Sequence, residues 1–104
     1  MKGGMNEMLR QAQIIQRKMT ALQEELKTRE IEAQSGGGMV SARVTGGKEL
    51  VALRIDKSVV EAGDVEMLED LVKAAVNEAL RKAGEMVEQE MGQLAGGMKL
   101  PGMF

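Results

Sequence analysis

A heptad pattern in the first thirty residues constrains this chain more than any other feature. Apolar residues recur there at alternating spacings of three and four, which places them on one seam of a single helix. The domain that follows is too small to cover so long a seam, so we expect a homodimer. Two pairings would satisfy it: this helix against its own copy, or against the second long helix of the partner. The seam comprises Met5 and the candidate dimer contacts Met8, Ala12, Ile15, Met19, Leu22 and Leu26.

The first half of the chain predicts a helix followed by strands. We expect residues 1–5 to be a flexible N-terminus, Asn6 to cap the helix, and the helix to run to about Thr28. From residue 30 the apolar period changes to two, which indicates three short strands in an antiparallel meander. Gly46-Gly47 predicts a two-residue hairpin turn. Each strand has one apolar face, and the third face is expected to be Val51, Leu53 and Ile55.

The second half predicts one more long helix. We expect a connector over residues 57–63, with Val59 and Val60 in the core, and then Asp64 as the cap of a helix over about 65–93. The broad apolar face of this helix suits covering a sheet. The expected fold is α+β, with an α-β-β-β-α protomer in one domain over residues 1–104 and a flexible Gly/Pro/Met tail over 94–104.

The composition excludes several classes of site. The chain has no cysteine and no histidine, which removes disulfides, Cys/His zinc sites, thiol nucleophiles and the usual general base near neutral pH. No apolar run approaches the ~20 residues that span a bilayer. The N-terminus has no apolar core of the signal-peptide kind. We therefore expect a cytoplasmic protein with no metal, no cofactor and no membrane partner.

The glycine and carboxylate patterns do not indicate an enzyme. Gly36-Gly37-Gly38 lies between two predicted strands, whereas a dinucleotide loop joins a strand to a helix. Gly47-Lys48 resembles the end of a P-loop, but Glu49 stands where Ser or Thr is required. The paired carboxylates have no nucleophile or metal-like cluster beside them. We expect no catalysis and no small-molecule substrate, with the glycines serving as turns or bulges.

The charge distribution leaves nucleic acid as a possible partner. Residues 1–57 hold ten Lys/Arg against seven Asp/Glu, a net charge of +3, and residues 58–104 hold four against nine, a net charge of −5. Arg10 and Arg17 fall on the back of the first helix and Lys18 on its flank, with Lys27 further along. The single aromatic residue provides no platform for base stacking. Any nucleic acid is therefore expected to be duplex DNA held through its phosphates.

Four segments in order give the chain a family resemblance. They are Gly36-Gly37-Gly38-Met39-Val40, Val51-Ala52-Leu53-Arg54-Ile55-Asp56, Met67 to Leu80, and Gly97-Met98-Lys99-Leu100-Pro101-Gly102. Together they resemble the YbaB/EbfC family of bacterial nucleoid-associated proteins, over nearly the whole chain. The resemblance implies a small cytoplasmic homodimer, tweezer-like in shape, with long helices projecting from a central sheet. It also implies DNA binding, nucleoid organisation and effects on gene expression.

Two functions follow as hypotheses. The first is a homodimer that binds duplex DNA largely without sequence specificity, with Arg10, Arg17, Lys18 and Lys27 as the first candidate contacts. Arg81 and Lys82 are second candidates, because Glu78 and Glu85 compete for them. The alternative is a protein-interaction adaptor that grips a protein partner through the Met-rich seam and the apolar tail, with DNA contact incidental.

Overall fold

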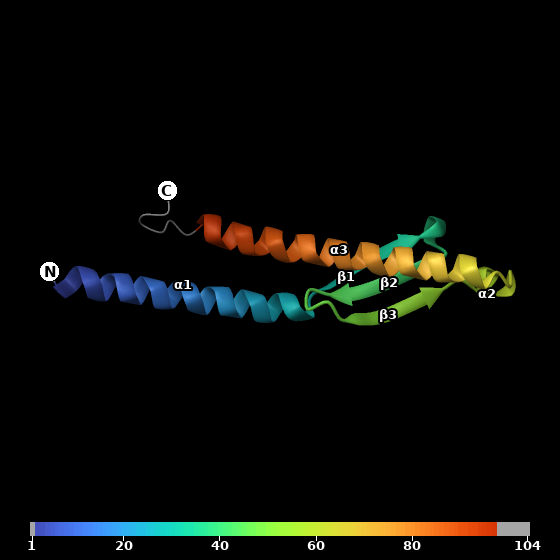
Figure 1. The fold of residues 1–104 in the computed structure, drawn as a ribbon. Coiled ribbons are helices and arrows are strands. Elements are labelled where there is room, and N and C mark those ends of the chain that lie inside the picture. The colour runs from blue at the N-terminus through green and yellow to red at the C-terminus, as the bar shows by residue number, and fades with distance from the viewer. Residues whose placement is uncertain (1, 98–104) are drawn as a thin grey trace.

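The computed structural model describes residues 2–97, which form an elongated α+β protomer. Its extents are 74 × 23 × 16 Å and its radius of gyration is 20.6 Å, whereas a compact chain of this length has about 13 Å. One long helix leaves the sheet at one end, and a second lies along the sheet and continues past it (Figure 1). The predicted α+β class and element order are confirmed.

Helix α1 spans Lys2–Thr28. It begins before Asn6, so the prediction that Asn6 caps this helix is wrong, and residues 2–5 are helical. Its C-terminal end is closed by the turn after the second strand. The amide of Gly46 donates to the carbonyl of Arg29 at 3.0 Å, and that of Gly47 donates to the carbonyl of Lys27 at 3.3 Å. The bond to Lys27 satisfies a carbonyl that the helix end leaves unpaired, and the bond to Arg29 holds the residue that follows the helix.

The sheet is an antiparallel meander of β1 (Glu30–Ser35), β2 (Val40–Thr45) and β3 (Leu50–Ile55), in the order β1-β2-β3. The predicted strands are confirmed. A bulge between Arg43 and Val44 changes the register, so Val44 lies opposite Leu50. Strict alternation places Val51 on the apolar face, and the bulge gives that place to Leu50 instead.

The two connections in the sheet differ from each other. Gly36–Gly38 form a 3₁₀ turn (η1) between β1 and β2, and all three have positive φ, which confirms that these glycines shape a turn. The second connection covers residues 46–49 and is longer than the predicted two-residue turn. Its left-handed residue is Lys48, with φ of 64°, so conformational freedom does not explain the two glycines before it.

The connector after β3 is a short helix, α2 (Lys57–Glu61). Asp56 caps it by accepting from the amide of Ser58 at 2.9 Å, and its bonds to Ser58 hold the pKa of Asp56 below its usual value. Val59 is buried as predicted, but Val60 is 59% exposed, so the prediction that both valines enter the core is half right.

Helix α3 spans Val65–Gly97 and covers the sheet. Asp64 caps it as predicted, since its carboxylate accepts from the amide of Met67 at 3.0 Å. The helix runs further than the expected end near residue 93 and includes Leu94 to Gly97, which the sequence assigns to the tail. The remaining predicted tail, residues 98–104, lies outside the described residues.

The core is built from small side chains. Three alanines one turn apart on α3 bring the helix close to the strands. α3 packs on β1 and β2, and the core cluster contains no fully buried residue from β3. The buried cluster consists of Ala33, Val40, Ala42, Val44, Ala75, Ala79 and Ala83.

Candidate nucleic-acid interface

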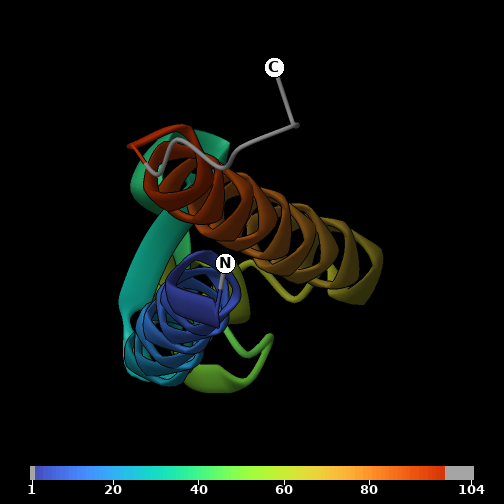
Figure 2. The same ribbon diagram turned by 90° about the vertical axis from the view of Figure 1, so that its left-hand side faces the viewer.

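Helix α1 extends well past the sheet and lies beside the C-terminal half of α3. The two helices run in opposite directions, and both views show them side by side (Figures 1 and 2). The other end of the molecule carries α2 and the start of α3. A long helical end is therefore presented to solvent, separated from the sheet that anchors it.

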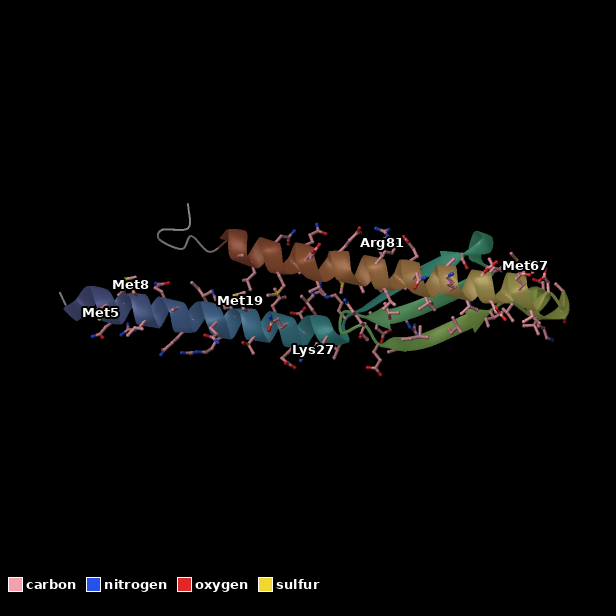
Figure 3. All side chains as sticks on the ribbon, in the orientation of Figure 1. Met5, Met8, Met19, Lys27, Met67 and Arg81 are labelled. Carbon is pink, nitrogen blue, oxygen red and sulfur yellow. The ribbon has the colours of Figure 1, made fainter. Side chains whose placement is uncertain are left out.

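The predicted seam of α1 is divided by this contact. Leu26 is only 1% exposed within the protomer, whereas Met5 and Met8 are 70% and 67% exposed. Between them, Ile15, Met19 and Leu22 are half-buried. Met19 lies on the side of α1 that faces α3 (Figure 3). The expectation that nothing in the same chain covers the seam is wrong at its C-terminal end, because α3 and the turn at Gly46 pack against the end of α1.

An ion pair joins the two long helices where they meet. The Arg29 guanidinium donates to Glu90 on α3 at 3.0 Å and to Glu25 on α1 at 2.5 Å. Its pKa is raised, first by the bond to Glu25 and then by the bond to Glu90. The pair of Arg29 with Glu25 is expected from the spacing. The bond to Glu90 is not, because it joins residues 61 positions apart.

The basic residues of α1 fall into two groups. Arg10, Arg17 and Lys18 are exposed and form no ion pair with any described residue. Arg10 and Arg17 lie two turns apart, about 10 Å along the axis. Lys27 is exposed as well, but it pairs with Glu24 at 3.2 Å. Arg10, Arg17 and Lys18 can therefore bind an anionic partner without breaking an existing ion pair.

The second candidates, on α3, are arranged differently. Arg81 bonds to Glu78 at 2.5 Å and also to Glu85. The bond to Glu78 is the main cause of the raised pKa of Arg81, and the same bond lowers the pKa of Glu78. Lys82 forms no ion pair among the described residues, so the expected competition for cations holds for Arg81 alone.

The two candidate sets do not share one surface. Lys27 and Arg81 point to opposite sides of the molecule (Figure 3). Beyond Lys82, the described part of α3 carries Glu85, Glu88 and Glu90 and no cation. Repulsion by these carboxylates disfavours a polyanion along this part of α3. The geometry therefore favours α1 as the contact helix.

The sheet carries two further cations that the sequence did not single out. Arg43 and Arg54 stand on the face turned away from α3, with Arg43 paired to Glu30 at 3.0 Å. They line a shallow depression together with Ser41, whose hydroxyl donates to Glu32. Alternation on the strands would have placed both arginines together. Because Glu30 and Glu32 share the face, its charges are mixed.

Two other kinds of feature are absent from the described part of the chain. No group of acidic side chains among residues 2–97 is arranged to hold a metal ion. None of the described helices is long and apolar enough to cross a membrane.

Comparison with known proteins decides the family. The YbaB/EbfC DNA-binding family matches residues 1–98. The chain belongs to this family. A nucleoid-associated protein of Alkaliphilus metalliredigens is 49% identical over 100 residues, covering 96% of this chain and 88% of that protein. One from Pelotomaculum thermopropionicum is 47% identical over 104 residues, covering 100% and 99% respectively.

A solved structure supports the fold of this YbaB/EbfC family member. The crystal structure of the uncharacterized protein HP0035 from Helicobacter pylori is similar, with a TM-score of 0.59 and 32% identity. The match covers 85% of this chain and 98% of that one. The family resemblance expected from the sequence is confirmed. Membership of a DNA-binding family also agrees with the prediction that the chain is a nucleoid-associated protein and not an enzyme.

Proposed function

We propose that this protein acts as a homodimer that binds duplex DNA largely without sequence specificity, through the exposed cations of α1. The observation that carries the proposal is the set of three exposed, unpaired cations Arg10, Arg17 and Lys18 on a helix that extends past the sheet. Membership of a DNA-binding family supports duplex DNA as the partner. Lys27, Arg81 and Lys82 are weaker candidates, because Lys27 and Arg81 are paired and Lys82 lies on α3.

The expected chemistry is phosphate contact. Lysine and arginine side chains on a helix back can bind phosphate oxygens without reading base edges, so such contacts carry no direct sequence information. The chain's only aromatic residue leaves little scope for base stacking. Binding is thus driven by counterion release from the duplex.

Dimerisation doubles the number of unpaired cations that one duplex can contact. A homodimer carries two copies of α1, so six unpaired cations are held at fixed separation on two helices. Two helices that hold one duplex would bend it, and two helices that hold separate duplex segments would bridge them. Either change is a physical basis for an effect on nucleoid organisation and gene expression. Relatives at about 50% identity are named nucleoid-associated proteins, which supports the nucleoid as the place of action.

The test is a salt titration of binding to a duplex of random sequence. We expect log affinity to fall linearly with log salt, and the slope divided by about 0.9 gives the number of phosphates neutralised. A second duplex of unrelated sequence should give the same affinity and slope. Absence of binding even at low salt, about 50 mM, would reject the proposal.

A protein-interaction adaptor is the second candidate function. The observation that favours it is the exposed apolar end of α1, where Met5, Met8 and Leu9 are 58–70% exposed. The tail residues assigned to this function, Met98, Leu100, Met103 and Phe104, lie outside the described residues. The same titration separates the two functions, because an adaptor has no reason to bind a random duplex with a steep salt dependence.

A further inference from the structure

A groove on α1 lies next to the place where α3 ends. Its floor continues the seam, with Ile15 and Met19 half-buried and the small side chain of Ala12 leaving space beside them. Met19 lies on the side of α1 that faces α3 (Figure 3), and the seam is fully buried only further along, at Leu26. The α1 groove is defined by Ala12, Ile15, Gln16, Met19, Thr20 and Gln23.

We propose that residues 98–104 dock in the α1 groove of the same chain. This inference goes beyond DNA binding and is independent of it, because it concerns what covers the middle of α1. The 98–104 segment follows directly on α3 and is rich in apolar side chains. Burial of these side chains in an apolar groove lowers the free energy of the chain in water. They are Met98, Leu100, Met103 and Phe104.

The position of the end of α3 fits this occupant. Arg29 bonds to Glu90 where the two long helices meet, and α3 continues from Glu90 to Gly97, which is about 10 Å. Because α1 runs in the opposite direction (Figure 1), Gly97 lies near the level of Leu22. From that level Ala12 is about 15 Å away along α1, and the axes of packed helices are about 8–10 Å apart. Seven residues extend to about 25 Å, so the 98–104 segment can span the groove.

The residue pattern of the 98–104 segment suits a groove better than a further helical turn. Pro101 has no amide hydrogen, and it biases the residue before it, Leu100, towards an extended backbone. In an extended chain, alternate side chains share one side. Met98, Leu100 and Phe104 would then face the groove together, and Lys99, the only charged residue of the segment, would face away from it.

The polar residues of the α1 groove match the backbone of an extended segment. Gln16, Thr20 and Gln23 line the groove and are exposed. Their amide and hydroxyl groups can both donate and accept hydrogen bonds, and an extended segment brings backbone amides and carbonyls that need partners. None of the described residues that line the groove is charged, so docking of an apolar segment would bury no charge there.

The test is NMR on the full chain. Phe104 is the only aromatic residue of the sequence, so every proton signal from an aromatic ring belongs to it. We expect nuclear Overhauser contacts from the Phe104 ring to the methyl groups of Ala12, Ile15 or Met19, with intensities that do not change on dilution. A ring that makes no contact with these methyl groups would overturn the inference.

A mixture of isotope-labelled and unlabelled chains identifies which chain supplies the docked segment. We expect the contacts of the Phe104 ring to arise only within one chain. Contacts between a labelled and an unlabelled chain would overturn the inference in favour of a segment supplied by a second copy.

Two neighbouring isoleucines provide a matched pair of variants. Ile15 lines the α1 groove, whereas Ile14 is 37% exposed and is not among the residues that line it. Ile15→Ser should remove the contact between the Phe104 ring and Met19, and Ile14→Ser should keep it at the wild-type intensity, with circular dichroism as the folding check. Equal intensities in the two variants would overturn the groove as the docking site.

The inference stays testable if Ile15→Ser fails to fold, because the wild-type spectrum and the mixed sample are decisive without it. Its failure is also distinct from failure of the proposed function. The salt titration measures binding to a duplex, and it does not depend on where the 98–104 segment lies.

Discussion

Gly46 lies so close to the end of α1 that a Cβ atom there would be 2.1 Å from the carbonyl oxygen of Leu26. The obstacle is helix backbone, which cannot rotate away as a side chain can. Gly46 is therefore required by the docking of the hairpin turn on the helix end, with its amide bonded to Arg29.

Replacing Gly46 with alanine should destabilise the protein by about 1–3 kcal/mol, since an overpacked contact forces the backbone apart. The measurement is urea unfolding at one fixed protein concentration. Gly92→Ala is the matched control, because Gly92 is inside α3 with open space around it. That variant should gain about 0.5–1 kcal/mol from helix propensity. Equal stability of the two variants would contradict the close approach.

The seam of α1 should show two different energetic halves. Leu26→Ala should cost about 2–4 kcal/mol, because it removes a side chain buried within the protomer. Met8→Ala should change stability by less than about 0.5 kcal/mol, since Met8 is largely exposed. Chemical denaturation of both variants tests this. A large loss of stability at Met8 would mean that a second chain covers that end of the helix.

Removing the three unpaired cations of α1 should weaken binding to every duplex about equally. The triple variant Arg10→Ala, Arg17→Ala, Lys18→Ala should lower the salt slope by about 0.9 for each phosphate that the protein no longer neutralises. Arg81→Ala should leave affinity within about twofold, because Arg81 is already neutralised by Glu78 and Glu85. The readout is fluorescence anisotropy at several salt concentrations. An unchanged affinity in the triple variant would remove α1 from the DNA-binding surface.

The cap of α2 should make a contribution to stability that depends on pH. The pKa of Asp56 is held below its unfolded value of 3.8, mainly by the amide of Ser58. Its contribution is thus fully present above 3.8 and falls away as the pH drops through the lower folded value. The stability difference between wild type and Asp56→Ala should shrink below that pH. Ser58→Ala is the control, because it removes the hydroxyl bond and keeps the amide.

Much of the fold could be predicted because periodicity reports which side of an element is covered. The alanines at positions 75, 79 and 83 on α3 and the alternation along β2 place the core correctly. Periodicity does not report what covers a stripe, so the sequence assigns the whole seam of α1 to a partner although Leu26 is buried within the protomer. The pair of Arg29 with Glu90 joins residues 61 positions apart, and the bulge at Val44 depends on how β2 and β3 pair. Periodicity reports neither of them.

The candidate DNA contacts could also be predicted only in part from the sequence. Charge and heptad position are enough to place Arg10, Arg17 and Lys18 on the outer surface of α1. They are not enough to separate Lys27 from these three, because its bond to Glu24 depends on how the side chains settle on the helix surface. The split of Arg81 from Lys82 likewise needs the positions of Glu78 and Glu85.

The division of the seam has a consequence for the rate at which α1 exchanges its amide hydrogens. Near Leu26 the helix is held by α3 and by the hairpin turn, so opening there requires disrupting the protomer. Towards Met8 the described contacts disappear, and a helical segment this short is marginal on its own in water. Protection should therefore fall steadily from Leu26 towards Met8. A bound duplex would supply part of the order that the exposed end of α1 lacks, which makes its helicity a reporter of occupancy.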